Sequence, residues 1–60
     1  MIKVIHKSAP LSEWFDKQEW CENNFGEPGT RWWVRCTLDH EEWLFSNQED
    51  SVLFQLTWSE

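Results

Sequence analysis

Apolar and polar positions alternate most regularly in the middle of the chain, from residue 31 to residue 38. The apolar positions are Trp32, Val34, Cys36 and Leu38. Successive side chains of a β-strand point to opposite faces, so the pattern predicts a half-buried strand over residues 31–38. Its outward positions include Trp33 between Arg31 and Arg35. Aromatic residues and arginine are enriched at interfaces, so this side of the strand is a candidate contact surface.

A helical period precedes this strand, over residues 11–25. Its apolar stripe has a spacing of three or four residues and consists of Leu11, Trp14, Phe15, Gln18, Cys21 and Phe25. Gly26 supplies a helix stop, and Pro28 follows it. Trp20 falls outside the stripe, among polar residues. It is either folded over a neighbouring loop or presented to a partner.

Three further strands are predicted from shorter patterns. Residues 2–6 are short, apolar and β-branched, which favours a first strand. The polar run 39–42 reads as a hairpin turn that leads into a third strand over 43–46. A second polar run, 47–50, reads as another turn. Residues 52–58 then alternate, which predicts a last strand with these inward positions: Val52, Phe54, Leu56 and Trp58.

Together these elements predict one α+β domain over residues 1–60. We expect a single four-stranded, mainly antiparallel sheet in the order β-α-β-β-β, with one helix packed on one face. The pattern leaves open whether the first strand pairs with the second or the fourth. Six tryptophans and four phenylalanines help so short a chain to form a core. The predicted centre of that core is Trp32, Val34, Phe54 and Leu56 with Trp14 and Phe15.

One helix can cover only one face of a sheet, which leaves the other face uncovered. Ile5 and Trp33 have the parity of that face, as do two leucines in the later strands. An exposed apolar patch of this kind usually marks a binding site, although antiparallel sheets often have one solvated face. The residues predicted to bind a partner are Trp33, Arg31, Arg35, Leu44, Leu53 and Trp20.

Eleven acids against five bases give a net charge of −6 at pH 7. This charge disfavours binding to phosphate backbones, which needs a basic surface, and suits a basic protein partner. The acids are also explained by solubility alone. The predicted acidic surface lies on the helix and in the two turns and consists of Glu13, Asp16, Asp39, Glu41, Glu42, Glu49 and Asp50.

Tests for reaction chemistry give no candidates. Cys21 and Cys36 lie on apolar faces of their elements, so we expect buried thiols without a disulfide. His6 and His40 are dispersed, which argues against a metal site, and no catalytic or cofactor-binding residue is predicted. No apolar run approaches the ~20 residues of a membrane span, and no signal-peptide pattern is present, so we expect a cytoplasmic protein.

The function predicted from these patterns is that of a small acidic, non-enzymatic interaction protein. Its uncovered sheet face around Trp33 would bind a protein partner or a second copy of the chain. A first alternative is an acidic mimic that blocks the nucleic-acid site of another protein, as small phage inhibitors do. A second alternative is binding of single-stranded nucleic acid, with Trp33 stacked on a base. The net charge makes a nucleic-acid partner the less favoured one.

Overall fold

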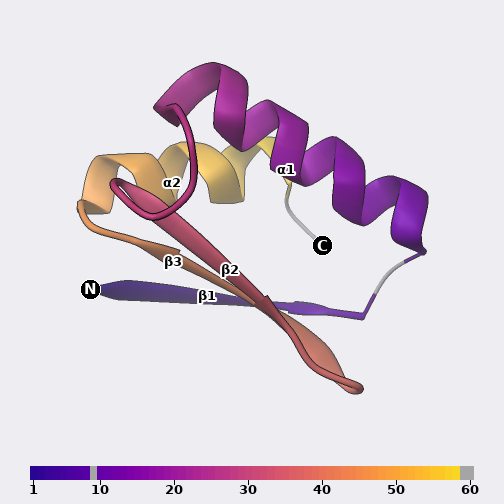
Figure 1. Cartoon of the computed structure of the whole chain (residues 1–60). Helices are drawn as coiled ribbons and strands as arrows, with labels where there is room; N and C mark the ends of the chain where they lie inside the picture. The colour runs from indigo at the N-terminus through magenta and orange to yellow at the C-terminus, as the bar shows by residue number, and fades with distance from the viewer. Residues whose placement is uncertain (9, 59–60) are drawn as a thin grey trace.

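The computed structural model describes residues 1–8 and 10–58. Three strands, β1 (Ile2–Lys7), β2 (Trp32–Cys36) and β3 (His40–Phe45), form one antiparallel sheet in the order β1-β3-β2. Two helices, α1 (Leu11–Phe25) and α2 (Gln48–Thr57), lie over the same face of this sheet (Figure 1). The molecule therefore has two layers, and neither helix covers the other face of the sheet. Within the described residues, neither helix is both long and apolar enough to cross a membrane.

The prediction of a four-stranded sheet with one helix is wrong, because residues 48–57 form α2. The side chain of Asn47 caps this helix by accepting a hydrogen bond from the backbone N–H of Asp50, over 2.9 Å. Glu49 and Asp50 add negative charge in the first turn, where the helix dipole favours it. The polar run 47–50, predicted to be a turn, is therefore the start of a helix.

The alternation after residue 51 was misleading because α2 is apolar on two opposite sides. Ser51 and Phe54 are buried against the sheet. On the other side, Val52, Leu53 and Leu56 are 45%, 44% and 76% exposed. A helix with apolar residues on both sides has no single stripe to reveal it, whereas every second position still happens to be apolar.

Strand β1 pairs antiparallel with β3, the central strand, and not with either of the strands considered for it. Opposite positions are Ile2 and Phe45, Val4 and Trp43, and His6 and Glu41. Because β2 is also antiparallel to β3, β1 and β2 run in the same direction, as the α1 crossover predicts. Both are edge strands.

The hairpin between β2 and β3 is shorter than predicted. Its tip lies at Leu38 and Asp39, where Thr37 N donates to the carbonyl oxygen of His40 over 2.9 Å. Strand β3 therefore begins at His40, and Leu38 is 98% exposed instead of facing the core. Val34 lies opposite Trp43. The inward and outward positions of both strands nevertheless agree with the predicted alternation, because Val34 and Trp43 both face the same side of the sheet.

The core lies between the sheet and the two helices, and most of it is aromatic. Its buried apolar residues are Val4, Cys21, Phe25, Trp32, Trp43, Phe45 and Phe54. The ring of Phe54 lies 4.9 Å from that of Trp43 and 5.2 Å from that of Phe45, measured between centroids. Of the predicted core centre, Trp32 and Phe54 are confirmed. Val34 and Trp14 pack at its margin, whereas Phe15 and Leu56 are exposed.

Helix α1 has the predicted bounds, but its buried side is turned toward Lys17 and Trp20. Lys17 is only 3% exposed, whereas Leu11 and Phe15 are 68% and 56% exposed. The helix ends at Gly26, whose φ of 90° is in the left-handed region. This orientation follows from interior partners for the lysine, described below, and from the packing of Trp20 on the core.

Candidate interaction surface

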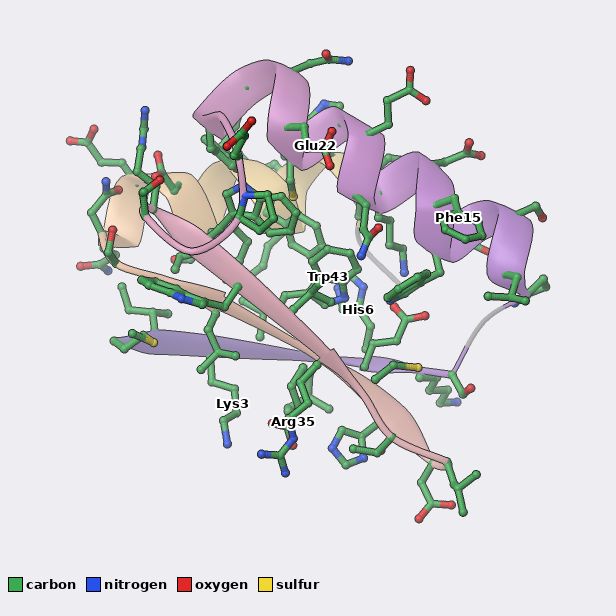
Figure 2. All side chains as sticks on the ribbon, in the orientation of Figure 1. Lys3, His6, Phe15, Glu22, Arg35 and Trp43 are labelled. Atoms are coloured by element: carbon green, nitrogen blue, oxygen red, sulfur yellow. The ribbon has the colours of Figure 1, made fainter. Side chains whose placement is uncertain are left out.

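The positions of the sheet that point away from the helices form the surface of interest. We call this surface the open face; it comprises Lys3, Ile5, Lys7, Trp33, Arg35, His40, Glu42 and Leu44. Figure 2 shows Lys3 and Arg35 extending from the side of the sheet that faces away from both helices. In the same view, His6 and Trp43 lie between the sheet and the helices.

An apolar group lies toward one end of the open face. Trp33 on β2 lies opposite Leu44 on β3, and both are partly exposed. Ile5 on β1 is 52% exposed and lies opposite Glu42. Leu44 is two residues after Glu42 on β3, so Ile5 and Leu44 are diagonal neighbours. Trp33 does not belong to the core cluster or to the partly buried residues packed on it. Trp33 therefore lies outside the core that the sheet forms with the helices.

A cluster of charged groups lies beside this apolar group, with Glu42 at the middle of the face. A Glu42 carboxylate oxygen lies 3.8 Å from both Lys3 Nζ and Arg35 Nε, and the other lies 2.8 Å from His40 Nε2. The hydrogen bond with His40 lowers the pKa of Glu42, and the positive charges of Lys3 and Arg35 lower it further. Glu42 is therefore ionised at neutral pH. The side chains of Lys3 and Arg35 remain 53% and 72% exposed.

Three of the six residues predicted to bind a partner share the open face: Trp33, Arg35 and Leu44. The other three lie elsewhere. Leu53 is on α2, in the other layer of the molecule. Trp20 packs edge-on against Phe25 and Phe54, with ring centroids 5.4 and 6.0 Å apart, so it is part of the margin of the core.

Arg31 also lies away from the open face, near the start of α2. It donates two hydrogen bonds to the carboxylate of Asp50, over 2.8 and 3.1 Å. Its guanidinium carbon lies 5.4 Å from the centroid of the Phe25 ring. This bidentate pair holds the loop before β2 against the first turn of α2.

The acids predicted to form a single surface are divided by the structure. Glu13, Asp16, Asp39 and Glu49 are exposed, and Glu42 lies on the open face. Glu41 and Asp50, however, are 1% and 6% exposed. Their assignment to solvated turns is wrong because Glu41 faces inward from β3 and Asp50 lies in α2, where each accepts hydrogen bonds from a base.

A buried polar cluster lies beneath α1. Lys17 Nζ is 3.1 Å from His6 Nδ1 and donates to Glu41 Oε1 over 3.3 Å. Trp43 Nε1 donates to the same oxygen over 3.1 Å. The side chains of Lys17 and Glu41 are only 4% and 1% exposed. Burial of a charge requires such partners, and here they join α1 to the sheet.

This cluster is not predicted from the sequence, although it contains the residue types of acid–base chemistry. Strand parity gives part of the signal, since His6 follows Ile2 and Val4 at every second position of β1. Nothing in the local sequence indicates that Lys17 enters the interior, because its partners come from β1 and β3. The lysine, imidazole and carboxylate contact one another beneath α1, so a substrate would have to displace the helix to reach them.

The two cysteines differ in environment. Cys21 is fully buried, and burial raises the pKa of its thiol to about 12, with smaller effects from the negative charges of Asp50 and Glu22. Cys36 is exposed at the end of β2, so the prediction that both thiols are buried is wrong for this residue. In the part of the chain that the structure describes, no group of three or more histidine, cysteine or acidic side chains is placed to hold a metal ion.

Comparisons with protein families, curated proteins and solved structures find no significant match to this chain. The function is therefore argued from the surfaces described above.

Proposed function

We propose that this chain is a small non-enzymatic interaction protein that binds a protein partner through the open face, with Trp33 as the principal contact. The observation that carries the proposal is the position of Trp33. It lies outside the core cluster, on the sheet face without a helix, opposite the partly exposed Leu44. Tryptophan and arginine are the residue types most enriched at binding hot spots, and Arg35 follows two positions later on the same side of β2.

The apolar group of the open face can supply a useful driving force. Each ~100 Å² of apolar surface buried against a partner contributes about 2.5 kcal/mol before the costs of association. A tryptophan offers large area with few rotatable bonds, so little conformational entropy is lost when it is fixed. Lys3, Glu42 and Arg35, which lie beside this group, would then form the polar part of the contact.

The charge of the open face favours a different protein over a second copy of the chain. Lys3 and Arg35 flank one acid of this face, Glu42. Two open faces placed against each other would bring these bases together, and like charges across an interface are unfavourable. The partner that suits this surface has apolar side chains bordered by carboxylates.

The non-enzymatic part of the proposal rests on the location of the reactive groups. Lys17, His6 and Glu41 are together but 5% exposed or less, and their polar atoms contact one another. The Cys21 thiol is buried and has a raised pKa, which suppresses the reactive thiolate. These contacts favour a structural role for the interior polar groups.

The proposal is tested by capture of a partner on three immobilised forms of the chain: wild type, Trp33→Ser and Leu38→Ser. Leu38 is the matched control because it is an apolar residue, 98% exposed, at the hairpin tip. A partner of the open face is retained by wild type and Leu38→Ser and is lost with Trp33→Ser. Titration of the purified partner against the same three proteins then gives the affinities.

Two results would contradict the proposal. One is that wild type and folded Trp33→Ser retain the same proteins. The other is binding of a fluorescent single-stranded oligonucleotide to the wild type that Trp33→Ser abolishes, since this outcome assigns the open face to nucleic acid instead. Circular dichroism of Trp33→Ser confirms that the variant is folded before either result is interpreted.

A further inference from the structure

The second feature that suggests a binding surface is the outward side of α2, which lies in the other layer of the molecule. Successive helix residues are ~100° apart, which places this side opposite the buried Ser51 and Phe54. Glu49, Val52, Leu53 and Leu56 follow the spacing i, i+3, i+4, i+7 along it. This spacing is that of a helix face that packs on another element. In this chain nothing among the described residues covers it, because the three apolar side chains are 44–76% exposed.

This side of α2 also borders a hollow. Its volume is about 440 Å³, and it is open to solvent. The residues that line it, which we call the outer face of α2, are Gln48, Glu49, Val52, Leu53 and Leu56. An elongated apolar surface with polar residues at one end suits an amphipathic helix laid along it.

The charges of the helix layer determine which kind of helix fits. The carboxylates that α1 and α2 expose are Glu13, Asp16, Glu19, Glu22 and Glu49. The same two helices expose no base, since Lys17 is buried and α2 contains none. Arg31 lies beside the first turn of α2 and is half exposed, but its charge is balanced by the bidentate pair with Asp50. The exposed Lys3 and Arg35 lie on the opposite side of the molecule, on the open face (Figure 2).

From this geometry we infer that the outer face of α2 binds a basic amphipathic helix of a protein partner. The apolar side of the partner helix would cover Val52, Leu53 and Leu56, and its lysines or arginines would meet the acidic helix layer. A second copy of the chain suits this surface less well, because it would bring two acidic layers together. The inference does not depend on the open face, which uses other residues on the other side of the sheet.

The inference is tested with three synthetic peptides of about 18 residues, or five helical turns. The first has an apolar stripe of leucines and a polar face of lysines. The second replaces every lysine with glutamate, and the third has the composition of the first in an order that forms no stripe. Amide chemical-shift changes of the isotope-labelled full chain report where each peptide binds. We expect saturable binding of the first peptide alone, with the largest changes along residues 48–57.

Variants separate the apolar contact from general charge attraction. Leu56→Gln, at a 76% exposed position, should weaken the leucine–lysine peptide by about tenfold, whereas Leu38→Gln should leave the affinity unchanged. Trp33→Ser should also bind this peptide as tightly as wild type, which separates the inference from the function of the open face.

The inference is overturned by equal binding of Leu56→Gln and Leu38→Gln, or by a glutamate peptide that binds as well as the lysine peptide. It is equally overturned if the striped and stripeless peptides bind alike. A concentration-dependent dimer that Leu56→Gln abolishes would assign the outer face of α2 to a second copy of the chain.

Discussion

The ion pair of Lys17 and Glu41 is buried and held by several partners. Both groups are almost fully withdrawn from water, and Glu41 Oε1 accepts from the Lys17 ammonium as well as from the Trp43 indole. The His6 ring, which stacks on Phe54 with centroids 5.2 Å apart, completes the surroundings of the lysine. A small domain retains such a group only when its partners are fixed, so α1 has little freedom to rotate on the sheet.

Removal of one member of this pair should destabilise the fold strongly. Lys17→Met leaves the Glu41 carboxylate buried without its counter-charge, which should lower the free energy of unfolding by about 3–5 kcal/mol. Lys3→Met is the control, because the Lys3 ion pair is exposed and should contribute less than about 1 kcal/mol. Urea denaturation measures both changes. Similar small effects of the two substitutions would show that Lys17 is solvated and that α1 packs differently.

The two thiols should react at very different rates. With its pKa near 12, Cys21 has a thiolate fraction of only ~10⁻⁴ at pH 8, and its side chain is buried. Cys36 is exposed and should react at once. A colorimetric thiol reagent should therefore modify about one cysteine per chain in the native protein and two in denaturant, and none quickly in native Cys36→Ser. Rapid modification of Cys21 in that variant would contradict the packing of α1.

Among the elements, α2 differs most from the sequence expectation, and a pair of alanine substitutions distinguishes helix from strand there. In α2, Phe54 is fully buried and Leu56 is 76% exposed. Phe54→Ala should therefore cost about 3–5 kcal/mol, whereas Leu56→Ala should change the free energy of unfolding by less than about 1 kcal/mol. In the predicted strand, both residues would face the core. Large losses from both substitutions in thermal or urea denaturation would restore the strand.

The sequence predicts those elements whose pattern is set locally. The bounds of α1 follow from its period and from Gly26, and the faces of β2 and β3 follow from strict alternation. The strand predicted over residues 52–58 is wrong because its alternating pattern competes with a helix start, which Asn47 and the acids after it indicate. Asn47 followed by Glu49 and Asp50 is the sequence signal for the start of the helix.

The candidate site was predictable to the same extent. Trp33, Arg35 and Leu44 lie together because their faces depend only on the β2–β3 hairpin. Leu53 would join them only if residues 52–58 formed a strand. Because these residues form most of α2, Leu53 lies in the other layer. The positions of Arg31 and Trp20 depend on contacts with α2 and with Phe25, which no local pattern encodes.

As a whole molecule, the protein has two sides of different chemistry. The open face combines an apolar group with Lys3 and Arg35, whereas the helix layer exposes carboxylates on α1 and Glu49 on the apolar outer face of α2. Five of the eleven acids lie exposed on the two helices, so much of the negative charge is on this side. Together, the two proposals imply two different partners, one on each layer.

In the proposed function, Trp33 contacts a protein partner, whereas the tryptophans in or against the core do not. Incorporation of 5-fluorotryptophan gives a fluorine resonance for each of the six indoles, and Trp33→Phe identifies the one that belongs to Trp33. When the captured partner is added, the Trp33 resonance should shift or broaden, and those of the buried Trp32 and Trp43 should stay in place. An unchanged Trp33 resonance in the presence of saturating partner would contradict the account.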